Sequence, residues 1–249
     1  MHGLGRLMWI ELKVFLREPL GAFGTVVAPV LVLVLFGRIG TYVVAGGAQK
    51  AATAFFTVDV PVFVTILISI NAVVSLVSIM SIYRESGILK RLSTTPLRPS
   101  TILTAHVLVK LFLTSMTLIL ALLFANRSLL TAAGVPFLRF LLAALIATAA
   151  ILSMGFVIAS FVPSGRFAQP ITSVLLYPMI AISGLFVPLS SYSPGFRSFA
   201  RVLPMTYAVS LLHGIWKGEA WAAHAGDIGA LFLVFAICTA LSTKIFRWE

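Results

Sequence analysis

The chain has 249 residues, 60% of them hydrophobic and only 10% charged, and its mean hydropathy is +1.08. A soluble domain carries about 25% charged and 45–50% apolar residues, and disorder needs low hydrophobicity, so the composition excludes both classes. The net charge of +11 would favour nucleic acid as the partner of a soluble protein. Here the bases lie between apolar segments, where they orient helices and contact lipid headgroups. We therefore expect an integral membrane protein with membrane lipids, and no nucleic acid, among its partners.

The first residues predict an amphipathic helix over 3–18 that lies in the cytoplasmic interface of the membrane. At 100° per residue, Arg6, Lys13 and Arg17 fall on one narrow stripe, and apolar side chains such as Trp9 and Phe15 cover another face. The alternative is an ordinary solvated helix end. A cleaved signal peptide is not expected, because the charged front is long and the apolar run after it exceeds 7–15 residues.

Six segments have the roughly 20 apolar residues that a membrane-spanning helix needs. They are 22–44, 59–82, 101–125, 136–161, 170–187 and 227–246. The stretch 188–216 is also apolar, but Pro188, Pro194 and Pro204 interrupt it. We interpret it as a re-entrant helical hairpin on the extracellular side, with a seventh span as the alternative. The expected fold is a single all-α transmembrane domain with six spans, an N-terminal interfacial helix and this hairpin.

The distribution of bases predicts the orientation. With the N-terminus inside, the short cytoplasmic pieces hold ten Lys and Arg residues and the outer pieces hold seven. The excess agrees with the positive-inside rule, and an even number of spans places both termini in the cytoplasm. We expect a multi-pass protein of the inner (plasma) membrane.

Polar residues within the predicted spans are candidates for a translocation pathway. One stripe lies on the second span and one pair on the third; they are Asn71, Ser75 and Ser78, and His106 and Lys110. The alternative is structural, because Ser and Thr often bond between helices and His106 and Lys110 could reach the cytoplasmic surface by snorkelling.

Motifs of enzyme chemistry are absent from the sequence. It contains no G-x-x-x-x-G-K-[ST] loop to hold ATP phosphates, no G-x-S-x-G and no H-E-x-x-H, and its four histidines lack metal-ligand spacing. Its single cysteine, Cys238, cannot form an intrachain disulfide. We therefore expect no catalytic, cofactor or metal site in this chain.

Three motifs resemble the permease subunits of ABC-2 type exporters. Arg84-Glu85-Ser86-Gly87, Leu89, Leu92 and Thr95-Pro96-Leu97 are similar to the charged run, Leu-rich turn and Thr-Pro-Leu of that family, although Ile88 replaces a common Thr. Leu16-Arg17-Glu18-Pro19 resembles the family's junction before the first span. The segment Ser183–Pro188, followed by Leu203–Ala208, resembles its outer hairpin.

The resemblance implies an ATP-driven exporter in which two permeases, expected to be identical copies, form the pathway for an amphiphilic drug, lipid or glycan. ATP and Mg²⁺ would bind to a separate ABC ATP-binding subunit, docked on the cytoplasmic connection 83–100 and the interfacial helix. The implied coupling residues are Arg84, Glu85, Gly87, Leu89, Lys90, Arg91, Leu92 and Pro96. The implied outer gate consists of Gly184, Phe186, Pro188, Pro204 and Tyr207.

Two other functions are compatible with the composition. The first is a membrane scaffold subunit that transports nothing. The second is an ion-coupled secondary carrier, which normally needs a carboxylate at mid-membrane depth, whereas Asp59 and Asp227 both lie at span ends. Co-purification with an ATPase would separate the exporter from the carrier, and transport by the reconstituted pair would separate it from the scaffold.

Overall fold

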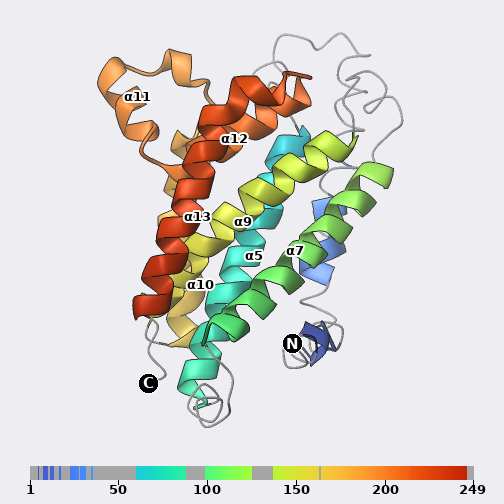
Figure 1. Cartoon of the computed structure of the whole chain (residues 1–249), viewed down its shortest axis with the longest axis vertical. Helices are drawn as coiled ribbons and strands as arrows, with labels where there is room; N and C mark the ends of the chain where they lie inside the picture. Colours follow the sequence, from blue (N-terminus) through green and yellow to red (C-terminus); the bar gives the residue numbers. More distant parts are fainter. Residues whose placement is uncertain are drawn as a thin grey trace.

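The computed structural model describes residues 5, 8–10, 12–13, 17, 23–27, 29–31, 35, 60–87, 99–124, 137–162 and 164–245. No β-strand occurs among these residues, which form α-helices joined by short 3₁₀ and irregular turns (Figure 1). The described residues from 5 to 17 are helical, and a short π-helix (η1) covers Phe23–Val27. The described part of the chain is thus all-α, as expected.

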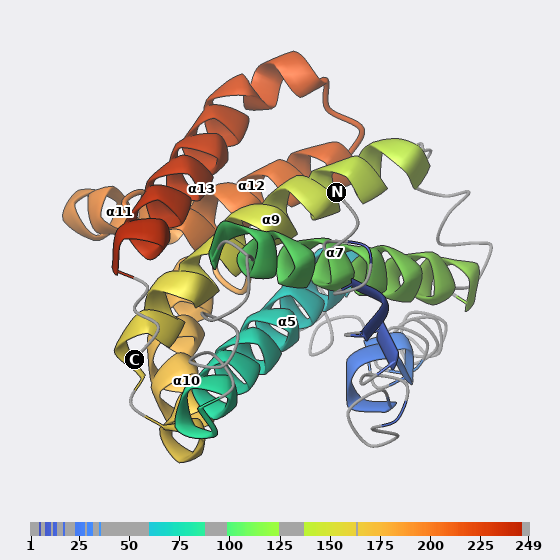
Figure 2. The same ribbon diagram turned by 60° about the horizontal axis from the view of Figure 1, so that its bottom comes forward.

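Long apolar helices form the body of the molecule. They are α5 (Val60–Glu85), α7 (Pro99–Phe124), α9 (Phe137–Phe161), α10 (Gly165–Ile182) and α13 (Ala225–Ile245). α9 lies among its neighbours and packs against α5, α7, α12 and α13, as the two views in Figures 1 and 2 show. α10 follows α9 after a tight corner and packs along α5.

The connection between α10 and α13 consists of shorter helices. A 3₁₀ turn (η2, Leu189–Ser191) is followed by α11 (Pro194–Ala200), α12 (Pro204–Trp216) and a second 3₁₀ turn (η3, Trp221–His224). Proline occupies the first turn of both α11 and α12, where its missing N–H costs no helical hydrogen bond. α11 lies outside the body at one end of the molecule, whereas α12 packs against α9 and α13 (Figure 1).

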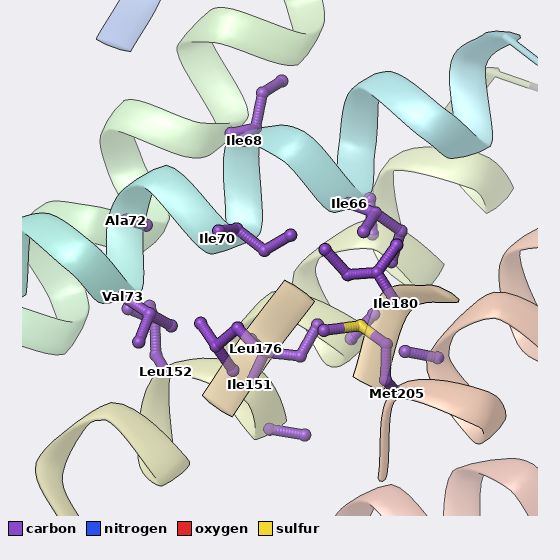
Figure 3. Close-up of a cluster of buried hydrophobic side chains, with 14 of the residues drawn as sticks. Ile66, Ile68, Ile70, Ala72, Val73, Ile151, Leu152, Leu176, Ile180 and Met205 are labelled. Atoms are coloured by element: carbon purple, nitrogen blue, oxygen red, sulfur yellow. The ribbon is translucent and has the colours of Figure 1, made fainter. Parts of the chain in front are cut away.

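Branched aliphatic side chains from several helices form the core. Figure 3 shows Ile66 and Ile70 of α5, Ile151 of α9, Leu176 of α10 and Met205 of α12 meeting in one cluster. Small residues on α9 allow its neighbours to approach closely; Ala143, Ala144, Ala147, Ala150 and Ala159 are all buried. A hydrogen bond also joins α5 to α9 within the core: the hydroxyl oxygens of Ser69 and Thr148 lie 2.9 Å apart.

The exterior of the helices is apolar, which fits a protein solvated by lipid chains. Phe112 of α7, Val174 of α10 and Phe232 of α13 are all more than half exposed. Three stretches of the described chain are long and apolar enough to cross a membrane: Val62–Glu85, Leu138–Phe161 and Trp221–Ser242. Val107–Leu120 is a shorter apolar stretch. This is a membrane protein.

The largest difference between a helix and its predicted span is at α10. α10 begins at Gly165 rather than near residue 170 and ends at Ile182 rather than at 187, and Pro170 and Pro178 lie inside it. The hairpin predicted for 188–216 contains the 3₁₀ turn, α11 and the well-buried α12. Most of the first predicted span, 22–44, lies outside the described residues.

Candidate functional site

The guanidinium of Arg84 binds the end of another helix. Its Nη1 donates to the carbonyl oxygen of Val162 at 3.0 Å, and its Nη2 donates to that of Ala159 at 3.1 Å. These carbonyls lie at the C-terminus of α9, where the last turn has no intrahelical donors of its own. A cation is also favoured there by the helix dipole. Arg84, at the end of α5, therefore caps α9.

Glu85, the next residue, binds the start of the following helix. Its Oε2 accepts a hydrogen bond from the backbone N–H of Gly165 at 3.1 Å. Gly165 is the first residue of α10, and a carboxylate is favoured at that end of a helix. The predicted coupling residue Glu85 thus has a hydrogen-bond partner within this chain, on α10.

These three bonds define the α5 junction: Arg84 and Glu85 with their partners Ala159 and Val162 at the end of α9 and Gly165 at the start of α10. The last two side chains of α5 thus link its end to the end of α9 and to the start of α10. The chain leaves the junction through Gly87, whose φ of +70° is the left-handed region that glycine adopts without strain. The junction lies at the opposite end of the molecule from α11 (Figure 1).

The other predicted coupling residues cannot be placed, because they are not among the residues that the structure describes. Leu89, Lys90, Arg91, Leu92 and Pro96 lie outside the described residues. So does Arg6 of the predicted interfacial helix. The described members of that helix, Lys13 and Arg17, are exposed.

Two of the five predicted pathway residues are in contact. Lys110 Nζ donates to Ser75 Oγ at 2.6 Å between α7 and α5. Lys110 is only 6% exposed, although it is the twelfth residue of a 26-residue helix. Its amine is thus held against α5 rather than reaching the membrane surface by snorkelling. Asn71 and Ser78 lie on the same helix as Ser75 and are half-buried, and His106 lies on α7 with its side chain outside the described residues.

The predicted outer-gate residues do not form one cluster. Gly184 and Pro188 lie on the wall of a pocket, Pro204 starts α12, and Tyr207 packs against the core. Phe186 is 48% exposed and makes an edge-to-face contact with Phe63 of α5, with 5.9 Å between ring centroids.

Arg197 of α11 binds the backbone of the turn that precedes its helix. Its guanidinium donates to the carbonyl oxygens of Leu189 and Ser190, at 3.0 and 2.8 Å. Phe196 and Phe199 are 41% and 55% exposed. Carbonyl groups in the proline-rich turn need hydrogen-bond donors, and the Arg197 guanidinium supplies them. The two phenylalanine rings remain on the exterior of the molecule.

A second polar cluster joins α12 to α13. The His224 imidazole is buried, with Nδ1 2.8 Å from Asp227 Oδ2 and Nε2 3.0 Å from Glu219 Oε2. Ser210 of α12 donates to the same Asp227 oxygen at 2.8 Å. A Cβ on Gly214 would overlap the His224 ring, so only glycine lets the ring lie this close to α12.

The same region contains a pocket of about 390 Å³. Its walls come from the end of α10, the 3₁₀ turn η2, α12 and the turn into α13; they include Ser183, Thr206, Ser210, Lys217, Glu219 and His224. Sequence analysis missed this cluster. The spacing of His224 and Asp227 at the start of a helix is the feature that could have indicated it, but the contact with Glu219 depends on how the turn folds.

Comparison with known proteins gives a family for this arrangement. The family model for ABC-2 type transporters matches residues 3–216, which is well over half of the chain. A relative, Nodulation protein J of Rhizobium leguminosarum bv. trifolii, is 26% identical over 95 residues. That match covers 38% of this chain and only 36% of the relative. The matched range includes the α5 junction and the segment 188–216, and the chain therefore belongs to the ABC-2 type transporter family.

Proposed function

We propose that this chain is the permease subunit of an ATP-driven ABC exporter. Two copies would form the pathway for an amphiphilic drug, lipid or glycan, and a separate ABC ATP-binding subunit would bind ATP and Mg²⁺ and hydrolyse the nucleotide. The family match over residues 3–216 carries this proposal. The sequence agrees with it, because it lacks a phosphate-binding loop of its own.

In this proposal the ATP-binding subunit docks on the connection 83–100 and on the interfacial helix 3–18. The connection leaves α5 directly after Arg84 and Glu85, and these residues bind the corner between α9 and α10. A displacement of the connection would therefore reach three helices together. This arrangement supports a role in coupling, since movement passes through a contiguous set of packed and hydrogen-bonded elements.

The substrate would pass along a surface that includes the Ser75–Lys110 contact. A buried base within an apolar span is costly, so its presence favours a functional role. The hairpin 188–216 would form the outer gate. In this proposal six spans cross the inner membrane and both termini lie in the cytoplasm.

The test is reconstitution of the chain with an ABC ATP-binding subunit in liposomes, followed by ATPase assays with a panel of amphiphiles and glycolipids. We expect the two proteins to co-purify and at least one compound to stimulate ATP hydrolysis. Lys110→Met should keep the complex intact and reduce this stimulation. Failure of the chain to bind any ATP-binding subunit would contradict the proposal, and binding without substrate-stimulated hydrolysis or transport would favour a scaffold.

A further inference from the structure

The pocket at the end of α12 presents hydrogen-bond acceptors. Three hydroxyls on its wall each donate their single proton to another group: Ser183 to the Ile180 carbonyl at 2.6 Å, Thr206 to the Ala200 carbonyl at 2.6 Å, and Ser210 to Asp227 at 2.8 Å. A hydroxyl oxygen that has donated its proton keeps lone pairs as acceptors. A ligand here is therefore favoured if it brings donors.

A carboxylate adds negative charge to the same wall. Glu219 uses Oε2 to bind His224 at 3.0 Å, which leaves Oε1 as an acceptor, and its side chain is about half exposed. Hydrogen bonds between a charged donor and a carboxylate are roughly twice as strong as neutral ones. The donor that fits best is thus a primary ammonium group.

The opposite charge is supplied by Lys217, an exposed base that also lines the pocket. Lys217 and Glu219 are two residues apart and line the same pocket, so an anion attached to an ammonium group bound at Glu219 would lie near Lys217. The volume of about 390 Å³ is in the range of small-ligand sites. The wall therefore suits a ligand that carries an ammonium and an anionic group close together.

The position of the pocket indicates where such a ligand comes from. Trp216 and Trp221 flank the turn that carries Lys217 and Glu219, and tryptophan is enriched at the level of the lipid headgroups. The exposed Phe196 and Phe199 of α11 lie on the same connection between α10 and α13. We propose that the pocket binds the zwitterionic phosphoethanolamine headgroup of a membrane phospholipid, with the ammonium at Glu219 and the three hydroxyls and the phosphate at Lys217.

Native mass spectrometry of the full chain tests this proposal with three phospholipids of identical acyl chains. Phosphatidylethanolamine has three N–H donors, phosphatidylcholine has the same charge but no N–H donor, and phosphatidylglycerol has the phosphate and hydroxyl donors but no positive charge. We expect at least about tenfold greater retention of phosphatidylethanolamine than of the other two, because only phosphatidylethanolamine has an ammonium group that can donate hydrogen bonds to the Glu219 carboxylate. Equal retention of the three lipids, or preference for phosphatidylglycerol, would overturn the proposal.

Variants assign the two charges. Glu219→Gln should remove the preference for phosphatidylethanolamine over phosphatidylcholine, whereas Lys217→Gln should reduce the retention of both by a similar factor. Arg201→Gln is the matched control, because Arg201 is an exposed base outside the pocket. Val209→Phe should fill the pocket from α12 and reduce binding independently of charge. An unchanged preference in both Glu219→Gln and Val209→Phe would overturn the proposal.

Free phosphoethanolamine distinguishes the lipid from a soluble ligand. If free phosphoethanolamine displaces the lipid only at a concentration much higher than that of the lipid, the site is a lipid site. If the free compound binds as tightly as the lipid, the same chemistry serves a soluble ligand. No binding of either would overturn the proposal. The assay needs no ATP-binding subunit, so its failure would leave the proposed permease function standing.

Discussion

Arg84 and Glu85 are neighbours in the chain, yet they bind opposite ends of two consecutive helices. The Arg84 guanidinium donates to the last carbonyls of α9, whereas the Glu85 carboxylate accepts from the first N–H of α10. Each charge has the sign that the dipole of its helix end favours. Two adjacent side chains thus fix a corner some 75 to 80 residues later in the sequence.

Arg84→Ala should destabilise the fold. It removes two charge-assisted bonds to α9, and the expected loss in the free energy of unfolding is about 1.5–3 kcal/mol. The measurement is thermal unfolding of the purified protein in detergent. Arg166→Ala is the control, because Arg166 is an exposed base on α10 near the same corner. Equal effects of both variants would show that Arg84 contributes only its charge.

Two variants of Glu85 distinguish a structural role within this chain from a contact with the ATP-binding subunit. Glu85→Gln keeps an oxygen that can accept from Gly165, so it should preserve most of the stability and most of the transport, whereas Glu85→Ala should reduce both. The assays are thermal unfolding and transport with the ATP-binding subunit. If Glu85→Gln is as inactive as Glu85→Ala but remains stable, its charge is needed by the partner instead.

Gly214→Ala should break the polar cluster between α12 and α13. The added methyl group would overlap the His224 ring and separate it from Glu219 and Asp227. Such overpacking costs about 1–3 kcal/mol, which thermal unfolding can detect. Gly195→Ala on α11 serves as the control, because a Cβ there has nothing within 4 Å. A similar loss in both variants would point to helix propensity rather than to His224.

Cysteine labelling tests the predicted orientation. In a chain with Cys238 replaced by alanine, Ser93→Cys should react with a membrane-impermeant thiol reagent from the cytoplasmic side only. Ser193→Cys, just before α11, should react from the outside only. Labelling of both positions from one side would mean that the number of spans between them is even rather than odd.

The sequence predicted the helices well because long apolar runs leave a membrane protein few alternatives. α9 was expected at 136–161 and lies at Phe137–Phe161, and α13 was expected at 227–246 and lies at Ala225–Ile245. The prediction for α10 was less accurate, because the span was expected at 170–187 and the helix lies at Gly165–Ile182, with Pro170 and Pro178 inside it. Periodicity alone cannot tell a proline that ends a helix from one tolerated inside a packed bundle.

The contacts of the polar residues were much harder to predict. The motif around Arg84 and Glu85 was identified, but their partners at 159–165 depend on tertiary packing that the local sequence does not specify. Ser75 and Lys110 were both candidates, and the structure supplied their contact. His224 was set aside because the four histidines lack metal-ligand spacing, and its contacts with Glu219 and Asp227 appear only in the folded chain.

The central place of α9 has a consequence for how the protein is made. A ribosome delivers α5 and α7 to the bilayer before α9, so the contact between Ser69 on α5 and Thr148 on α9 cannot form until α9 has been made. The buried faces of α5 and α7 likewise wait for residues 137–161. Insertion machinery or lipid must shield these surfaces in the meantime. A chain arrested before α9 is therefore the stage of synthesis at which quality-control proteases have the most to recognise.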